Sequence, residues 1–480
     1  MGLLQDGRPG DPEQPGSSES PVEQPDQLAA RLRAAQRSGL TRPLAWRRRQ
    51  LAAMASMLRE AEDELLAAMR ADFGKPPLEG WLTEIGHVAN EIAHIQRHLE
   101  AWAAPERVPV RTLLRPARAR VQPEPLGVAL VIAPWNYPVH LLLLPMAYAI
   151  AAGNAVVGKP SEVTPATSAA LARLVPRYLD ERTTAVVEGG VEETTALLDA
   201  RWDHIFYTGN GRVGRVVMAA AARHLTPVTL ELGGKSPVIV ERSADVRTAA
   251  RRVAWGKYLN AGQTCVAPDY VLVDEEVEQP FVSALAEAVR SFYGERPLDS
   301  PDLARIVDDR HFARLSGLLD AAGPARVAVG GARDAERRLV EPTVLTGVGW
   351  DDAVMAEEIF GPILPVITVS GVGEAVDAVN AGDKPLALYV FSEDRAVVER
   401  VISSTSSGGV GVNCTLLQLA VTDLPFGGVG ASGMGSYHGK AGFDTFSHRK
   451  AVLSRPARPD PPAMYPPYTP LKSRLLRRLS

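Results

Sequence analysis

A single cysteine in a loop of small residues is the first candidate for covalent chemistry in this chain. Cys265 ends the run Gly262-Gln263-Thr264-Cys265, and a thiol in such a loop has the open approach that a nucleophile needs. The thiol must lose its proton, with an ordinary pKa of roughly 8.5, before its sulfur attacks. A lone cysteine is more often a small apolar residue than a catalyst, so Cys265 depends on its neighbours for this interpretation.

A glycine-rich motif and a carboxylate precede the cysteine. Gly209, Gly211 and Gly214 match the pattern G-x-G-x-x-G between a strand-like and a helix-like run. Backbone N–H groups at such a helix start can hold a pyrophosphate, and a plain strand-to-helix turn is the alternative. Dinucleotide sites also use an acidic residue about 20 positions further on, where Glu231 stands. Because Glu231 also ends a strand just before a Gly-Gly pair, it is a candidate either for binding a ribose or for acting as a base.

Five ordered motifs resemble the signatures of the aldehyde dehydrogenase superfamily. They are PWNYP at 134–138, KPSE at 159–162, LELGG at 230–234, GQTC at 262–265 and EIFGP at 358–362. The ending, with LPFGGVG at 424–430, GMGSYHGK at 433–440 and FSHR at 446–449, is similar to the class 3 branch. The resemblance extends from about residue 30 to residue 455.

The resemblance implies oxidation of aliphatic or aromatic aldehydes to carboxylic acids with NAD(P)+. The Cys265 thiolate would add to the aldehyde carbon, and the Asn136 amide with the Cys265 backbone N–H would donate to the oxyanion. Hydride transfer would convert this thiohemiacetal into a thioester. Glu231 would then activate the water that hydrolyses the thioester, which leaves it free of any role in binding the ribose.

The resemblance also implies two sets of binding residues. Lys159 and Glu162 would hold the adenosine ribose, and Glu358 would hold the nicotinamide ribose with Phe360 alongside. NAD is the expected cofactor because Glu162 would repel a 2′-phosphate, although class 3 relatives often accept NADP too. The full cofactor set is Trp135, Lys159, Glu162, Gly209, Gly211, Gly214, Leu232, Glu358 and Phe360, and the apolar substrate tunnel would contain Tyr137, Leu141, Trp255 and Gln418.

Several of these residues also have simpler interpretations. Asn136 is well placed to cap the helix that follows it. Glu358 stands next to another glutamate, as is typical of a solvated surface. Lys159 is typical of a lysine that keeps a strand end in water. Gly211 stands where much of the superfamily has Thr, so any phosphate contact there is with the backbone alone. Gln418 stands where class 3 relatives often have His, which leaves the substrate preference open.

Two other functions compete with aldehyde oxidation. A cysteine-dependent ester or thioester hydrolase would need a histidine to activate Cys265, and no nearby residue in the sequence supplies one. A non-catalytic structural relative would not need Cys265, Glu231 and Asn136 together. We interpret Cys414 as structural, and no group of His, Asp and Cys has metal-ligand spacing, so no metal site is expected.

The elements that must position these residues follow an alternating pattern. Apolar strand-like runs at 127–133, 155–159, 184–188 and 203–208 alternate with helical runs, for example 139–152 and 164–178. Continuous apolar strands separated by helices predict a parallel, doubly wound sheet. A second alternating region at 237–413, with a helix at 277–292 and strands at 363–369 and 386–391, predicts another α/β domain.

These patterns give a domain plan of the aldehyde dehydrogenase fold. A Rossmann-like NAD(P)-binding domain would comprise 27–106 and 126–233, with one helical stretch running from 44 to 69. An oligomerisation hairpin would occupy 107–125, the α/β catalytic domain 234–430, and a C-terminal oligomerisation segment and tail 431–480. Residues 1–26, rich in Pro, Gly, Ser and acidic side chains, predict a disordered leader.

Composition limits the partners that the chain can have. A net charge of −4 over 480 residues gives no basic surface for nucleic acid. Two cysteines make no disulfide framework, which favours a reducing cytoplasmic setting. Class 3 relatives are dimers, so a homodimer through 108–121 and the segment after 452 is expected. The basic, leucine-striped end at 471–479 has three interpretations: docking on the parent dimer, disorder, or a weak contact with an anionic membrane surface.

Overall fold

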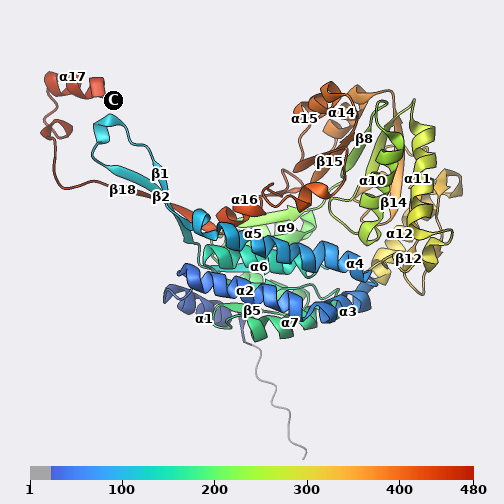
Figure 1. The fold of residues 1–480 in the computed structure, drawn as a ribbon, viewed down its shortest axis with the longest axis horizontal. Helices are drawn as coiled ribbons and strands as arrows, with labels where there is room; N and C mark the ends of the chain where they lie inside the picture. Colours follow the sequence, from blue (N-terminus) through green and yellow to red (C-terminus); the bar gives the residue numbers. More distant parts are fainter. Residues whose placement is uncertain (1–22, 480) are drawn as a thin grey trace, which may run out of the picture.

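The computed structural model describes residues 23–479, which form two α/β bodies and a thin extension (Figure 1). The first body is built on a six-stranded sheet of order β17-β7-β6-β3-β4-β5. All its strands pair in parallel except β17, which is antiparallel to β7 at one edge. The strands are β3 (Val128–Ile132), β4 (Ala155–Lys159), β5 (Thr184–Val186), β6 (His204–Gly209), β7 (Val228–Leu232) and β17 (Gly433–Met434).

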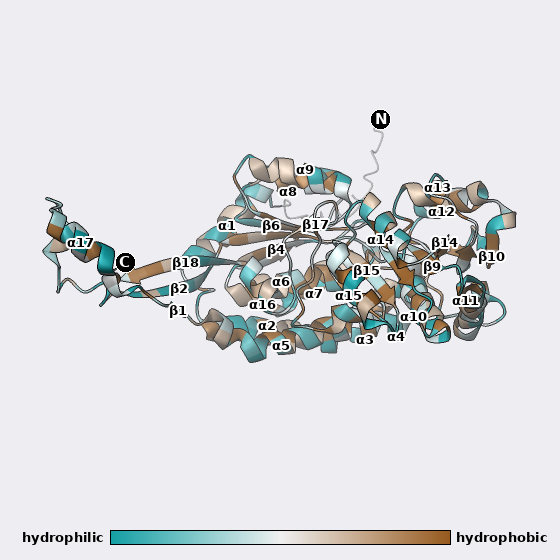
Figure 2. Cartoon of the chain, turned by 90° about the horizontal axis from the view of Figure 1, so that it is seen from above, coloured by the Kyte–Doolittle hydropathy of each residue, from teal (hydrophilic) through white to brown (hydrophobic). Residues whose placement is uncertain are grey.

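Helices cover both faces of this sheet, as Figure 2 shows from above. Alternate residues of β3 face opposite sides, because successive side chains of a strand point to opposite faces. Ala129 and Val131 pack with one set of helices, and Val128 and Leu130 with the other. The first set is α2 (Leu44–Glu60), α5 (Gly86–Ala103), α6 (His140–Ala152) and α7 (Pro165–Tyr178), and the second is α1 (Pro25–Arg37), α8 (Val191–Asp199) and α9 (Gly211–Ala222).

The second body holds a seven-stranded sheet of order β10-β13-β14-β9-β8-β15-β16. Its strands are parallel except β10, and most are buried along their whole length, as expected for runs of Val, Ile and Leu between helices. The strands are β8 (Pro237–Val240), β9 (Tyr270–Asp274), β10 (Val327–Val329), β13 (Thr343–Leu345), β14 (Ile363–Val369), β15 (Ala387–Phe391) and β16 (Gly409–Val412). The main helices are α10 (Val246–Tyr258), α11 (Glu278–Tyr293), α12 (Asp309–Ala322), α14 (Val372–Ala381) and α15 (Arg395–Ser404).

The extension is a three-stranded antiparallel sheet that projects from the first body (Figure 1). β1 (Glu106–Val108) and β18 (Ser447–Ser454) pair on either side of β2 (Arg118–Pro125). The ion pairs Arg449–Glu106, at 2.7 Å, and Lys450–Glu124 reinforce it. The last helix, α17 (Pro470–Leu479), lies near the outer end of this sheet.

The two α/β units confirm the fold class predicted from the sequence, and three local expectations differ from the structure. The helical stretch 44–69 breaks at Ala61, where α2 ends and α3 (Glu62–Phe73) begins, because Ala61 leaves helical geometry. The expected leader overlaps α1, which starts at Pro25, and residues 1–22 lie outside the described residues. Residues 433–445, expected in an oligomerisation segment, supply β17 and α16 (Gly439–Thr445) of the first body. Among the described helices, none is both long and apolar enough to cross a membrane.

Candidate active site

The chain changes direction across the first sheet between β3 and β6. From β3 it runs outward to β4 and β5, and it then returns to the other side of β3 to form β6 and β7. In doubly wound sheets a ligand crevice opens at the carboxyl ends of the strands at such a switch point. Trp135 and Asn136 follow β3, Gly209 ends β6, Lys159 ends β4, and the candidate cofactor residues of this body therefore converge on one edge.

The glycine motif begins α9 at this edge. Asn210 caps the helix, accepting a hydrogen bond from the Val213 N–H at 3.0 Å. A Cβ placed on Gly211 would meet only the Arg215 guanidinium, at 3.5 Å, so the backbone there is open to an approaching group. Gly214 is different, because a Cβ there would lie 3.0 Å from the Leu232 side chain. Gly214 therefore lets α9 pack against the end of β7.

Lys159 and Glu162 form an ion pair beside this motif. Their Nζ and Oε2 atoms lie 3.6 Å apart, and Nζ also donates to the Pro160 carbonyl at 2.7 Å. Burial lowers the pKa of Lys159, and the nearby Glu162 carboxylate partly opposes this. The Lys159 side chain is 2% exposed and that of Glu162 50% exposed. A buried cation paired with an open carboxylate at the crevice edge fits a ribose with its hydroxyl groups.

Glu358 and Phe360 come from the second body and face the first. A Cβ on Gly233 would lie 2.1 Å from a Glu358 carboxylate oxygen, so only glycine lets this carboxylate lie against the end of β7. Burial and the charge of Asp269 raise the pKa of Glu358 to about 8. The Phe360 and Trp135 rings meet edge to face with centroids 5.4 Å apart. A buried carboxyl group and two aromatic rings thus lie together where the two bodies meet.

The charge of the Glu231 carboxylate affects the pKa of the Cys265 thiol. Burial raises the pKa of the half-buried Cys265 to about 12, and the charges of Glu358 and Glu231 raise it further, while backbone N–H groups of Cys265 and Val266 oppose this. Glu231 ends β7 and is 2% exposed. Neither of its carboxylate oxygens has a protein hydrogen-bond partner. Burial raises the pKa of Glu231 well above that of an ordinary carboxyl group, as expected for a carboxylate kept out of water.

Asn136 is fixed by the loop that carries the thiol. Its side-chain Nδ2 donates to the Gln263 backbone carbonyl at 3.0 Å, and the backbone carbonyl of Asn136 accepts from Asn260 Nδ2 at 3.0 Å. The Tyr137 and Thr264 hydroxyl groups lie 2.6 Å apart in the same seam. The side chain of Asn136 therefore links the end of β3 to the loop that carries Cys265, and an amide group has a second N–H besides the one that this bond uses.

A cavity of about 220 Å³ opens onto Cys265. Tyr137, Leu141 and Trp255 lie in its wall, as the sequence predicts for the tunnel. Gln418 does not lie in the wall. Its Nε2 donates to the Tyr389 hydroxyl at 3.2 Å, and its chain neighbours Leu417 and Leu419 line the cavity instead. The complete lining is Leu82, Thr83, His87, Tyr137, His140, Leu141, Trp255, Leu259, Thr264, Cys265, Val266, Leu416, Leu417, Leu419, Ala420, Phe426, Tyr437 and His438.

The structure shows site residues that the sequence did not single out. Gln263 Nε2 donates to the Asn260 carbonyl at 3.0 Å and to the Arg305 carbonyl at 3.1 Å, which holds the nucleophile loop. A fully buried ion pair joins Lys75 to Glu84, and Lys75 Nζ lies 4.1 Å from the centre of the Tyr137 ring. Gln263 belongs to the GQTC run, so its position was a signal. No comparable signal marks Lys75, which follows the glycine at the end of α3.

The hydrolase interpretation fares less well on this geometry. Three histidines, His87, His140 and His438, do line the cavity, although the sequence near Cys265 supplies none. Within the described part of the chain, however, none of these histidines forms a hydrogen bond with the thiol, and the charged groups that act on Cys265 are the carboxylates of Glu358 and Glu231. The Glu231 carboxylate, which has no hydrogen-bond partner, favours a base for water more than a Cys–His pair.

Comparison with known proteins identifies the family of this chain. The aldehyde dehydrogenase family profile matches residues 17–452. Aldehyde dehydrogenase family 3 member A2 of Mus musculus is 50% identical over 423 residues, which cover 88% of this chain and 87% of the relative. Among solved structures, substrate-bound AldH of Staphylococcus aureus has a TM-score of 0.92 at 42% identity, covering 94% of this chain and 98% of that one. An NAD-dependent aldehyde dehydrogenase of Sinorhizobium meliloti has a TM-score of 0.83 at 30% identity, covering 91% and 88%.

The match to a family 3 member confirms the class 3 resemblance, and the fold, the open thiol and the dinucleotide crevice account for its chemistry. The chain belongs to the aldehyde dehydrogenase family and is an oxidoreductase that converts aldehydes to carboxylic acids with NAD(P)+.

Proposed function

We propose that Cys265 is the nucleophile, Glu231 the general base and Asn136 the oxyanion donor of this oxidation. The observation that supports the assignment best is the pairing of a reachable thiol with a buried carboxylate that no protein group satisfies. A base for water must keep its lone pairs free of other partners, and Glu231 does so. Asn136 is held against the nucleophile loop by its bond to Gln263, which gives an amide donor of fixed orientation.

The steps follow from these positions. The Cys265 thiol first loses its proton to solvent. Its sulfur then forms a bond to the aldehyde carbon as the carbonyl π bond breaks, and the carbonyl oxygen becomes an oxyanion, for which the Cys265 N–H and the Asn136 amide are the proposed donors. When bound, NAD(P)+ accepts the hydride that leaves this carbon, which converts the thiohemiacetal to a thioester. Glu231 then takes a proton from water as the water oxygen attacks the thioester. The carbon–sulfur bond breaks, releasing the acid and the thiol.

The cofactor residues fall into two groups along the crevice. Lys159 and Glu162 are proposed to bind the adenosine ribose, and the backbone of 209–214 the pyrophosphate, because these groups converge at the switch point. Glu358 and Phe360 are proposed to bind the nicotinamide ribose, with Trp135 and Leu232 beside them. NAD is favoured over NADP because the half-exposed Glu162 carboxylate would repel a 2′-phosphate.

The substrate is proposed to be an aliphatic or aromatic aldehyde without a second charge. None of the described residues that line the cavity is Lys, Arg, Asp or Glu, and most are apolar or aromatic. Such a wall gains free energy by removing apolar surface from water and offers no counterion to a carboxylate.

We also propose a homodimer in the cytoplasm. β1, β2 and β18 have no fully buried residue, and Val108 and Leu453 are 41% and 60% exposed, so the extension has no core of its own in one chain. A partner subunit would cover this apolar surface. Both cysteines are free thiols, which agrees with a reducing compartment. Residues 27–106 and 126–233, together with 433–445, would form the cofactor domain, and 234–430 the catalytic domain.

Replacement of the proposed nucleophile tests the assignment directly. We expect Cys265→Ala to abolish reduction of NAD by every member of an aldehyde panel, measured with NAD and in parallel with NADP, while NAD binding stays within about threefold of wild type. Cys414→Ala is the matched control, because Cys414 is the other free thiol and lies outside the cavity lining. Its activity should match wild type. Turnover retained in Cys265→Ala would contradict the mechanism.

A further inference from the structure

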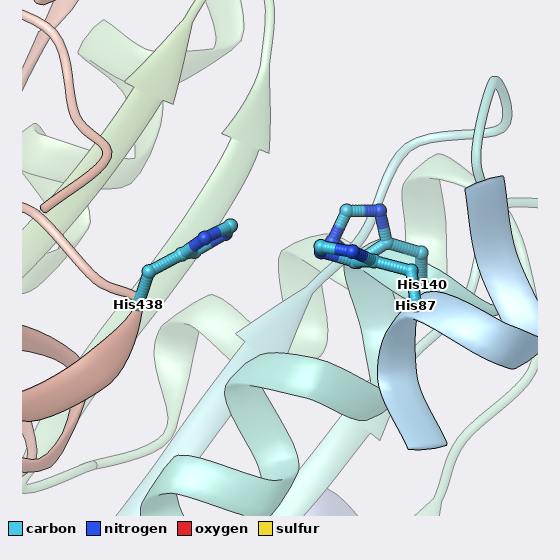
Figure 3. A group of neighbouring side chains, drawn as sticks. All are labelled: His87, His140 and His438. Carbon is cyan, nitrogen blue, oxygen red and sulfur yellow. The ribbon is translucent and has the colours of Figure 1, made fainter. Parts of the chain in front are cut away.

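Three histidines from distant parts of the chain meet in the wall of the aldehyde cavity. His87 lies in the first turn of α5, His140 begins α6, and His438 precedes α16. Figure 3 shows the ring of His438 pointing across the gap toward the other two. The His87 centroid lies 4.6 Å from that of His140 and 5.7 Å from that of His438. One ring nitrogen from each residue lies within 4.8 Å of those of the other two.

The ring nitrogens of this cluster have few protein partners. His87 Nε2 and His140 Nε2 are buried without a hydrogen bond, and so are both ring nitrogens of His438, which is 1% exposed. A buried polar atom without a partner costs free energy, so packing alone does not explain three imidazoles here. Leucine or phenylalanine would fill the same wall without that cost. The cluster therefore has the character of a ligand site.

We propose that His87, His140 and His438 bind one divalent transition-metal ion in the wall of the aldehyde cavity. Three imidazole nitrogens without a carboxylate select zinc-like ions over Mg²⁺ or Ca²⁺, which prefer oxygen ligands. A tetrahedral zinc site has Zn–N bonds of about 2.0–2.1 Å, which place its nitrogens about 3.4 Å apart. From separations of at most 4.8 Å, rotation of the rings closes the site.

Such a site is open on the cavity side. Three protein ligands leave one coordination position for water, and that position faces the space that also contains Cys265. In a cavity of about 220 Å³, an ion with its water removes a large part of the room for an aldehyde. The bound ion therefore inhibits aldehyde oxidation in competition with the aldehyde. The binding itself does not depend on the proposed function, whereas this inhibition does.

The binding test must separate the imidazoles from the thiol, because a cysteine is also a good zinc ligand. The full-length Cys265→Ser chain, cleared of metal, is titrated with Zn²⁺ against a coloured chelator. We expect one ion per chain. In the same background, His87→Gln and His438→Gln should each weaken binding by at least about 10–100-fold, the loss that removal of even an outer-shell partner causes. His448→Gln is the matched control, because His448 is exposed on β18, and its affinity should match the parent.

Co²⁺ gives a second measurement that needs no histidine variant. In the Cys265→Ser chain it should show the strong visible bands of a four- or five-coordinate ion, without a sulfur-to-metal charge-transfer band. Weak bands typical of a hydrated octahedral ion would overturn the proposal. So would Zn²⁺ binding that keeps its full affinity in both His87→Gln and His438→Gln, or binding that appears only when Cys265 is present.

The inhibition is measured separately in the chain with Cys265 intact. We expect Zn²⁺ to raise the apparent KM for the aldehyde and not that for NAD, and His87→Gln to lose most of this effect relative to its own zinc-free rate. Inhibition that persists in His87→Gln would overturn the link between the cluster and the cavity. A chain that binds Zn²⁺ at the cluster but oxidises no aldehyde would contradict the proposed function and leave the metal site standing.

Discussion

Glu231 shows why residue type alone does not decide a role. Its spacing from the glycine motif matches that of a ribose ligand, yet it ends β7, where its charge acts on Cys265. Lys159, which ends β4, pairs with Glu162, and we propose this pair as the ribose ligand instead. In this assignment the base and the ribose ligand lie on different strands.

Replacement of Glu231 by Gln tests its role as a base. Thiol addition and hydride transfer precede water attack, so Glu231→Gln should release a burst of about one equivalent of reduced cofactor per site and then turn over slowly. Loss of a general base costs on the order of a hundredfold or more in the affected step. Rapid mixing at saturating NAD measures the burst, and a direct titration measures NAD binding. Weak NAD binding with normal thioester hydrolysis would assign Glu231 to the ribose.

The pKa directions at the site predict an alkaline rise in rate. Below its raised pKa, Glu231 is protonated and cannot accept a proton from water, so thioester hydrolysis slows as the pH falls. The pKa of the Cys265 thiol is also raised, to about 12, so the fraction present as the nucleophilic thiolate increases as the pH rises. Between about pH 6 and 10, wild-type steady-state turnover should increase. Glu231→Gln should keep the rise in burst rate, which comes from the thiol, and lose the rise in steady-state rate. A flat wild-type profile would contradict both assignments.

The residues of the site were more predictable from the sequence than their surroundings. Cys265, Asn136 and Glu231 stand in dense local motifs, because each needs a defined backbone around it. His87, His140 and His438 carry no such motif, since only the fold of α5, α6 and the loop before α16 brings them together. Gln418 was placed by analogy at the tunnel, but its side chain reaches the Tyr389 hydroxyl instead.

At the scale of elements, the nucleophile loop depends on an unusual run of backbone. Asn260, Ala261 and Gly262 all have positive φ, at 54°, 52° and 73°. A Cβ on Gly262 would lie 2.3 Å from the Gly361 carbonyl oxygen. The loop that carries Cys265 and the loop that carries Glu358 therefore meet backbone to backbone, and this contact sets the distance between the nucleophile and the proposed nicotinamide ribose site.

Gly262→Ala should for this reason damage catalysis more than stability alone would predict. Strained φ costs of order 1–3 kcal/mol, and a shift of about 1 Å in the reacting groups can cost about 100-fold in rate. We expect a lower melting temperature and a fall in kcat/KM of about that size. Gly347→Ala is the matched control, because Gly347 has φ 64° with nothing within 4 Å of the added Cβ. It should lose stability without the catalytic defect, and equal kcat/KM in the two variants would contradict the role of the contact.

Elements with continuous burial were predictable, and elements fixed by distant partners were not. β4 and β14 occupy the predicted 155–159 and 363–369, because a mostly apolar run between helices is typical of a buried parallel strand. β17 is two residues long and exists because Gly433 and Met434 pair with Glu231 and Leu230 of β7. No local pattern in two residues could reveal a pairing made across two hundred positions.

At the scale of the molecule, the extension predicts a dimer. Light scattering at micromolar concentration should give twice the 51.5 kDa mass of one chain. Leu453→Asp would place a charge in the surface that a partner covers, so we expect it to shift the population toward monomer. Leu225→Asp is the control, because Leu225 is 90% exposed and lies between α9 and β7 of the first body. A monomer mass for the wild-type chain would contradict the dimer.

The contacts of the C-terminal helix favour docking on the extension over binding to a membrane surface. α17 contacts the turn at Thr112–Leu114 of the extension, and Lys472 Nζ donates to the Tyr465 carbonyl at 3.0 Å. Its apolar stripe is only ten residues long, which gives too little buried surface for strong lipid binding even with basic side chains around it. We therefore propose that α17 docks on the extension.

Deletion of residues 471–480 tests this choice. Because α17 lies far from α6 and α10 (Figure 1), which contribute to the cavity wall, the shortened chain should keep the dimer mass and a kcat/KM within about twofold of wild type, the range expected for a surface change. Both chains are also pelleted with anionic vesicles, alongside neutral vesicles as the control. If docking is the role of α17, neither chain should pellet appreciably with either vesicle. A wild-type fraction that pellets with anionic vesicles and disappears on deletion would show that the basic face of α17 meets lipid instead, and the docked position would then be its state away from the membrane.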